Sequence, residues 1–169
     1  MAPEKKPYEL IQDLVAQRAS WSDADVMAEL EQLPPLADED DPVWDNEDYW
    51  NDFAYRYIAL SDVAAERRLR PAVRLLLERA CNGDPGEIMR GLRHASERTF
   101  SPDWSALADV CIELSASKRA GTRWWAIEQL MILDDPRARR VFDKALCDEV
   151  AEIRDVAAIG LERLDRISK

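Results

Sequence analysis

Apolar residues recur at intervals of three and four along almost the whole chain, the spacing that places them on one face of an α-helix. One such stripe follows Pro7. A second follows Ser22, where Asp25 stands three residues later, as in a helix-capping box. Alternating runs of β-branched residues are scarce, and the chain has only five glycines. The pattern therefore predicts an all-α protein.

Proline residues punctuate this helical pattern. A proline is tolerated in the first turn of a helix, where its missing amide hydrogen has no partner to lose, and a preceding Asp or Ser can cap the helix. The helix starts that we predict on this basis lie at Pro71, Asp84-Pro85, Ser101-Pro102 and Asp135-Pro136. Because the connections are short, we expect successive helices to pack antiparallel as a string of helical hairpins.

The stretch LADEDDPVWDNEDYWNDF, residues 36–53, departs from the rest of the chain. It carries eight acidic side chains, four aromatic ones and no Lys or Arg. Its aromatic half leads into a helix, and we expect Trp50, Phe53 and Tyr57 to share the buried face, with a bend near Ser61-Asp62. A helix N-terminus favours nearby carboxylates, which accounts for a few acids but not for eight without a counter-charge.

Charge is divided unevenly along the chain. Residues 1–62 contain 16 acidic and 4 basic side chains, a net charge of −12, whereas residues 63–169 have a net charge of +1. Such a field repels nucleic acid phosphates and anionic membrane surfaces and attracts a basic protein over about 8–10 Å in cellular salt. Two interpretations stay open for the acidic stretch: a solvated loop, or a docking surface for a basic partner.

The docking interpretation is the one that we prefer, and it assigns two roles. The carboxylates would make the electrostatic contacts, and two aromatic side chains would act as anchors. The contact residues are Asp38, Glu39, Asp40, Asp41, Asp45, Glu47 and Asp48, and the anchors are Trp44 and Tyr49.

No catalytic, cofactor or metal site is predicted. His94 is the only histidine, NGDPG at 82–86 is helix punctuation and no phosphate loop, and the acidic run lacks the alternating ligands and central glycine of an EF-hand. Cys81, Cys111 and Cys147 are widely spaced among apolar neighbours, which favours buried, reduced thiols. With no secretory signal and no membrane-spanning run, we expect a cytoplasmic protein.

The last third of the chain resembles itself. Five residues from Arg123 to Asp134 match five from Arg154 to Asp165 at a constant offset, and weaker helical spacing continues upstream. Within this region Trp124 and Trp125 are adjacent in a helix, so their side chains cannot point into the same helix–helix interface. Either this is a central helix covered by neighbours on two sides, or one indole is exposed and anchors a partner. For Gly160, close approach by the preceding helix is a sufficient explanation.

Thr122 to Leu164, TRWWAIEQLMILDDPRARRVFDKALCDEVAEIRDVAAIGLERL, resembles the HEAT-repeat family, specifically the short bacterial type related to phycobilisome-lyase repeats. The shared pattern is an arginine and a small residue on the first helix, an Asp-Pro turn and a second helix. The resemblance continues, more weakly, back to about residue 62. It implies one all-helical domain over 1–169, an α-solenoid of about three helical hairpins over 46–169, with residues 1–45 as an N-terminal two-helix cap and acidic stretch.

Acidic HEAT-like proteins of this size look similar to immunity proteins of bacterial polymorphic toxin systems. The resemblance therefore implies a non-enzymatic module that binds a basic toxin domain, with nuclease toxins suited to the charge. A general HEAT scaffold or assembly factor is the alternative. A HEAT-like DNA glycosylase is a second one, but the basic residues that it would use sit in a region of near-neutral charge, so we expect them to pair on the surface instead. They are Arg67, Arg68, Arg70, Arg74, Arg137, Arg139, Arg140 and Lys144.

Overall fold

A computed structural model describes residues 6–37, 41–80 and 87–167. Those residues fold entirely into helices and connecting turns, which confirms the predicted all-α class. The N-terminal half contains α1 Pro7–Arg18, α2 Asp23–Gln32, η1 Pro42–Asp45, α3 Glu47–Tyr49, η2 Trp50–Ala54, α4 Tyr55–Arg67 and α5 Arg70–Glu78. The C-terminal half contains α6 Glu87–Phe100, α7 Trp104–Leu114, α8 Ala120–Leu133, η3 Pro136–Ala138, α9 Arg139–Ala145 and α10 Ala151–Ile167.

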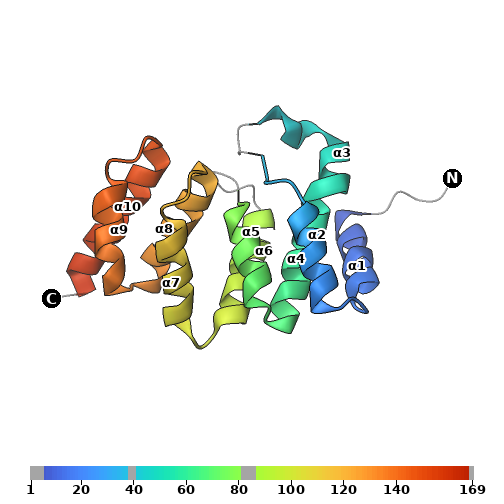
Figure 1. The fold of residues 1–169 in the computed structure, drawn as a ribbon. Helices are drawn as coiled ribbons and strands as arrows, with labels where there is room; N and C mark the ends of the chain where they lie inside the picture. The colour runs from blue at the N-terminus through green and yellow to red at the C-terminus, as the bar shows by residue number, and fades with distance from the viewer. Residues whose placement is uncertain (1–5, 38–40, 81–86, 168–169) are drawn as a thin grey trace.

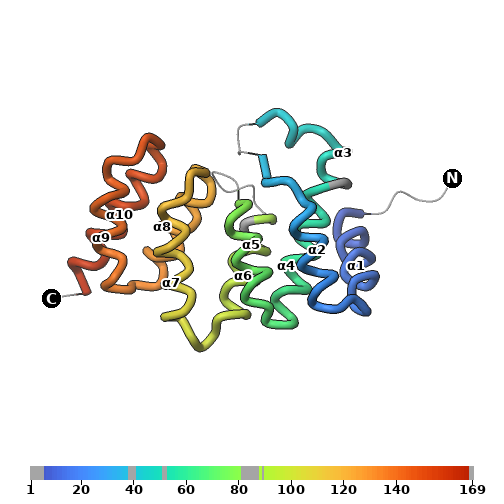
Figure 2. Tube along the Cα trace, in the orientation of Figure 1, coloured from blue at the N-terminus to red at the C-terminus, as the bar shows by residue number. Residues whose placement is uncertain are grey.

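The helices stand side by side in a row, with the two chain termini at opposite ends (Figure 1). Within the row α1 packs on α4 and α4 on α6, while α8 packs on α7 and α10. The chain trace shows α2 and α5 beside α4 and α6 in the middle of the row (Figure 2). None of the described helices is both long enough and apolar enough to cross a membrane.

The apolar stripes meet in one continuous core that runs along the row. Its largest fully buried side chains include Trp125, Tyr57, Phe100 and Phe142, so each half of the chain supplies an aromatic residue to it. The Tyr57 hydroxyl donates to the main-chain oxygen of Leu76, which ties α4 to α5 inside the core. Burying large apolar side chains is the main source of stability in such a packing.

Several predicted helix starts are confirmed. The Ser22 hydroxyl accepts from the Asp25 amide at 3.2 Å, and the Asp25 carboxylate accepts from the Ser22 amide at 2.8 Å, which completes the capping box. Pro71 lies in the first turn of α5. Asp135 accepts from the Arg137 amide at 2.9 Å. The start predicted at Asp84-Pro85 lies outside the described residues.

The start predicted at Ser101-Pro102 is wrong by two residues. Asp103 caps α7 instead, and its carboxylate accepts from the Ala106 amide at 3.2 Å. Ser101 instead continues α6, because its amide still donates to the Glu97 oxygen at 2.9 Å, and α7 begins only at Trp104.

The helix predicted around Trp50 also differs from the structure. The expected bend at Ser61-Asp62 is absent, since α4 runs unbroken from Tyr55 to Arg67. The irregularity comes earlier, at the π-helical segment η2, where the Tyr55 amide bonds to the Trp50 oxygen five residues back. This wider turn shifts the helical register. Tyr57 is fully buried as expected, but Trp50 and Phe53 are only half-buried.

The prediction of buried thiols holds for Cys111 and is wrong for Cys147. Cys111 lies in the core of α7, whereas Cys147 is exposed. The reason is local: α9 ends at Ala145, and the Cys147 amide closes a turn by donating to the Lys144 oxygen at 3.2 Å. Cys81 lies outside the described residues.

The sequence repeat has a structural counterpart. Arg123 Nη1 donates to the oxygens of Ser117 and Lys118, both at 3.1 Å, and Arg154 Nη1 donates to the oxygens of Asp148 and Glu149 at 2.8 and 3.1 Å. Each arginine therefore reaches back five and six residues to the turn before its own helix.

The tryptophan pair and the mid-helix glycine behave as packing features. Trp125 is completely buried and Trp124 is half-buried, which is what a helix contacting both α7 and α10 requires. A Cβ atom on Gly160 would lie 2.8 Å from the ring of Phe142 in α9. Close approach by the preceding helix is thus the reason for this glycine, as predicted.

Candidate partner-binding surface

From residue 41 on, the acidic stretch forms a short irregular segment that rises above the tops of α2 and α4, where η1 leads into α3 (Figure 1). Local side chains shape it. Asp41 accepts from the Val43 amide at 2.9 Å to start η1, and Asn46 accepts from the Asp48 amide at 2.9 Å to start α3. The π-helical segment η2 then joins α3 to α4. The sequence therefore builds this projection from consecutive capped turns.

Aromatic side chains hold the projection together. The Trp44 ring meets the Tyr49 ring edge-on, with centroids 5.0 Å apart, and lies 5.4 Å from the Trp50 ring. Phe53 and Tyr55 extend these contacts at 5.6 and 5.7 Å. The five rings form what we call the aromatic cluster: Trp44, Tyr49, Trp50, Phe53 and Tyr55.

Two hydrogen bonds tie this cluster to the backbone. The Trp50 indole donates to the Trp44 oxygen at 2.7 Å, and the Ala37 amide donates to the Tyr49 hydroxyl at 3.0 Å. Trp44 and Tyr49, the predicted anchors, are both half-buried. The structure thus brings the rings of the two predicted anchors into contact.

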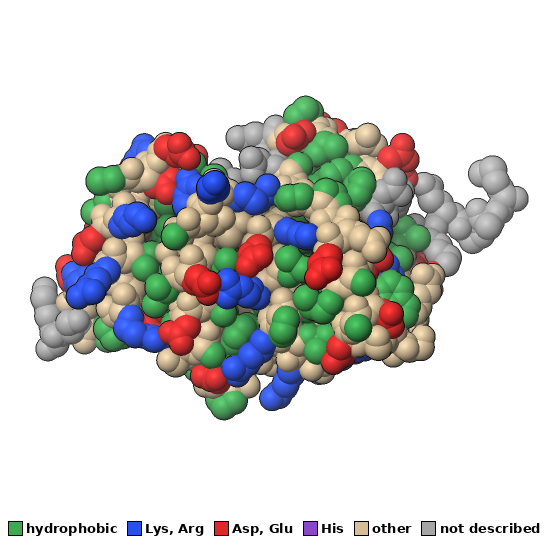
Figure 3. Space-filling model, viewed as in Figure 1, with side chains coloured by type: hydrophobic (Ala, Val, Ile, Leu, Met, Phe, Trp, Pro, Cys, Tyr) green, Lys and Arg blue, Asp and Glu red, His purple; other side chains and the backbone are tan. Residues whose placement is uncertain are grey.

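The predicted carboxylate contacts divide into two groups. Asp38, Glu39 and Asp40 lie outside the described residues. The other four are exposed and form what we call the acidic surface: Asp41, Asp45, Glu47 and Asp48. Figure 3 shows acidic and hydrophobic side chains together at the top of the molecule, over η1 and α3. Within the described residues, none of these four carboxylates forms an ion pair.

The basic residues elsewhere contrast with this surface because most of them are already paired. Five of the eight basic residues considered for nucleic acid binding form ion pairs inside the protein: Arg67, Arg70, Arg74, Arg137 and Arg139. Arg137, for example, bridges Asp109 and Asp135, and its hydrogen bond holds the pKa of the Asp135 carboxyl below its usual range. The expected surface pairing is confirmed for these five arginines.

The helices below the acidic surface are fixed by a second set of charges. Glu29 of α2 accepts from Arg18 of α1 at 3.1 Å and from Arg56 of α4 at 2.5 Å. Burial alone would raise the pKa of Glu29, but the hydrogen bonds from Arg56 and Arg18 outweigh it and lower that pKa. Arg67 adds bonds to the oxygens of Trp21 and Arg18 at 2.7 and 3.0 Å. The helices that carry the projection are therefore linked to one another by ion pairs and hydrogen bonds.

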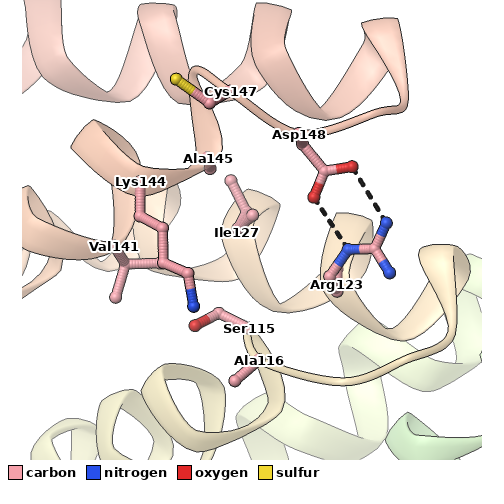
Figure 4. A pocket seen from close by; sticks show the side chains of 9 residues that line it. All are labelled: Ser115, Ala116, Arg123, Ile127, Val141, Lys144, Ala145, Cys147 and Asp148. Atoms are coloured by element: carbon pink, nitrogen blue, oxygen red, sulfur yellow. Dashed lines mark hydrogen bonds and ion pairs between the residues drawn. The ribbon is translucent and has the colours of Figure 1, made fainter.

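One cavity in the C-terminal half has a volume of about 200 Å³ (Figure 4). Charged side chains line it, but several of its polar groups already bond to other groups of the protein. Arg123 binds Asp148 through two hydrogen bonds, at 2.8 and 2.9 Å, and only 11% of either side chain is exposed. The Ser115 hydroxyl donates to the Ile112 oxygen at 2.7 Å. The Arg123–Asp148 pair and the serine are thus already engaged in holding the repeat together.

The single histidine has no partner set typical of catalysis or metal binding within the described chain. His94 is exposed on α6 and faces Asp62 of α4. Burial raises the pKa of Asp62, Glu66 adds to that effect, and His94 opposes it. Across residues 6–37, 41–80 and 87–167, no three His, Cys, Asp or Glu side chains gather in a way that could hold a metal ion.

Comparisons with protein-family models, with curated proteins and with solved structures returned no match for this chain.

Proposed function

We propose that the chain is a small HEAT-like α-solenoid, residues 46–169, that carries its N-terminal cap and acidic stretch at one end. The support comes from the repeated arginine. Arg123 and Arg154 hold equivalent turns at the offset of the sequence repeat, as stacked copies of one helical unit would. A row of helices with a charged projection suits recognition of another macromolecule.

We infer that this protein is a non-enzymatic binding module whose partner is a basic protein. One observation carries the inference. Four exposed carboxylates, none of them in an ion pair with another described residue, lie beside the aromatic cluster, whereas many arginines of the rest of the chain form internal ion pairs. A surface with unbalanced charge of one sign attracts a partner of the other sign. Long-range attraction of this kind chiefly raises the association rate, whereas desolvated aromatic contacts lengthen the lifetime of the complex.

Among basic protein partners, we propose a toxin domain that this protein neutralises in the cytoplasm, as an immunity protein. Proteins that cleave nucleic acids carry cationic surfaces, so a nuclease toxin has the complementary charge. Covering that cationic surface would exclude its substrate. The half-buried rings of Trp44 and Tyr49 would supply the apolar contact at the centre of the acidic surface.

The test replaces the acidic surface without changing its shape. The variant carries Asp41→Asn, Asp45→Asn, Glu47→Gln and Asp48→Asn; the control variant neutralises four exposed carboxylates of the C-terminal end, Asp143→Asn, Glu152→Gln, Asp155→Asn and Glu162→Gln. Proteins captured from a lysate of the producing cells are identified by mass spectrometry at low and high salt. We expect the first variant alone to lose a basic partner that the native protein captures more strongly at low salt.

Unchanged capture by the first variant would show that the acidic stretch is a solvated loop. Binding of duplex DNA in a mobility-shift assay would count against the proposal from another direction, because the proposed partner is a protein.

A further inference from the structure

A groove interrupts the helix row between α6 and α8. The neighbouring pairs α4 with α6 and α8 with α10 pack closely, but α6 and α8 do not, and α8 joins the row through α7 and α5. The opening has a volume of about 300 Å³. It is lined by Glu97 of α6, by Trp104 and Leu107 of α7, and by Gln129, Ile132 and Leu133 of α8.

The lining exposes large apolar side chains to solvent. Trp104 is 42% exposed and Ile132 is 39% exposed, which places both among the most exposed large hydrophobic residues of the described chain. Trp104 is the first residue of α7, directly after the Asp103 cap, and it both lines the groove and remains partly open to solvent. Leu107 and Leu133 continue the apolar lining inward. Covering these surfaces would be favourable because it removes apolar area from water.

The charges around the groove leave one carboxylate open. Glu128 pairs with Arg93 at 2.7 Å, Asp103 with Arg70 at 2.9 Å and Asp135 with Arg137 at 2.6 Å. Glu97, in contrast, is exposed and has no ion-pair partner within the described part of the chain. The groove is therefore lined by both this Glu97 carboxylate and the Trp104 indole ring. A Lys or Arg side chain can satisfy both, by an ion pair and a cation–π contact.

We propose that this groove binds a basic amphipathic helix of the protein partner. An apolar side chain of that helix enters between Leu107 and Ile132, and a Lys or Arg one turn away lies between Glu97 and Trp104. An amphipathic helix presents side chains at this spacing along one face. The inference rests on the proposed function for the basic character of the partner, and it adds a second contact on a different part of the molecule from the acidic surface.

The first experiment uses two synthetic helical peptides with the same leucine face. One carries lysine on its polar face and the other carries glutamate. Both are titrated into the isotope-labelled full chain while NMR follows the Trp104 indole N–H and the Ile132 δ-methyl group. We expect both signals to shift saturably with the lysine peptide and not with the glutamate peptide. Equal shifts with the glutamate peptide, or shifts confined to residues 41–49, would overturn the groove proposal.

Variants test the same site with a matched control. We expect Ile132→Glu and Trp104→Ala each to weaken binding of the lysine peptide about tenfold or more. Glu97→Gln should weaken it less and remove part of its salt dependence. Ile159→Glu changes an isoleucine on α10 that is 51% exposed, lies outside this groove and should leave binding unchanged. A tenfold loss in Ile159→Glu, or none in the groove variants, would contradict the proposal.

The two proposals can fail separately. The acidic-surface variant described above should still bind the lysine peptide through the groove. Peptide binding in the groove together with unchanged partner capture by that variant would overturn the acidic-surface proposal only. Concentration-dependent shifts of Trp104 without any peptide would identify a second copy of this chain as the occupant and overturn the groove proposal.

Discussion

Arg123 and Arg154 occupy equivalent positions of the sequence repeat, and each binds through Nη1 the two main-chain oxygens five and six residues earlier. The turns that they hold are alike in another respect. The Ser117 hydroxyl accepts from the Arg119 amide at 3.2 Å, and the Asp148 carboxylate accepts from the Val150 amide at 3.0 Å, at the same offset along the chain. The two copies of the repeat therefore share the hydrogen bonds of their turns as well as the spacing of their apolar residues.

The Arg123–Asp148 pair should be important for stability because it is nearly buried. Asp148→Asn removes the nearly buried charge partner of Arg123 and leaves only the exposed Glu149, so we expect it to lower the free energy of unfolding by about 2–3 kcal/mol. Chemical denaturation followed by circular dichroism measures the change. Arg139→Ala, which breaks an exposed pair with Asp165, serves as the control and should change stability little. Equal effects of the two substitutions would contradict this assignment.

Gly91 and Gly160, both inside helices, should respond to alanine in opposite ways. At Gly160 a Cβ would come within 2.8 Å of the Phe142 ring, so Gly160→Ala should destabilise by about 1–3 kcal/mol despite its better helix propensity. At Gly91 the nearest atom, in Ile58, would be 3.9 Å away, so Gly91→Ala should stabilise by up to about 1 kcal/mol. Thermal unfolding of both variants checks the signs. Adding Phe142→Leu to Gly160→Ala should restore part of the loss.

Asp62 predicts a pH dependence. Its pKa is raised by burial and by Glu66, against the effect of His94, so the folded state holds this proton more tightly than the unfolded state does. The carboxyl is neutral in both states below an unfolded pKa of about 3.9, and its ionisation costs stability as pH rises through the folded pKa. Asp62→Asn should therefore gain stability relative to the native chain as pH rises from about 4 to 7. A constant difference across that interval in pH-dependent denaturation would contradict the prediction.

The cysteines should differ sharply in reactivity. Burial raises the pKa of the Cys111 thiol far above its usual value, whereas Cys147 is exposed in a turn. Iodoacetamide should modify Cys147 in the folded protein and Cys111 only after denaturation. Peptide mapping by mass spectrometry identifies each modified position. Rapid native labelling of Cys111 would show that α7 opens locally far more often than its burial suggests.

Local features were predicted well where only neighbouring residues decide them. The Ser22–Asp25 capping box, the proline in the first turn of α5 and the Asp135 turn all depend on contacts within a few residues. The predicted contact residues of the acidic stretch were partly located: Trp44 and Tyr49 pack on each other, and four carboxylates are exposed. Their role in binding stays a prediction.

The errors arose where distant or competing contacts decide the outcome. A regular helical period predicted burial of Trp50 and Phe53, but the π-helical segment moves both rings into the aromatic cluster. The Ser101 amide stays bonded to α6, and Asp103 caps α7. The groove residues Glu97, Trp104 and Ile132 were missed altogether. A tryptophan at the first position of a helix, next to polar residues, was the one available signal.

The sequence by itself determined the all-helical class, several helix starts and the concentration of negative charge in the first third, because these depend on spacing, local hydrogen bonds and composition. Only the tertiary structure decided which arginines form ion pairs, which carboxylates form none, and that α6 and α8 diverge. Those outcomes require side chains from distant segments to meet, as Arg70 meets Asp103 and Arg74 meets Glu113. The spacing of residues along one helix does not specify which other helix packs against it.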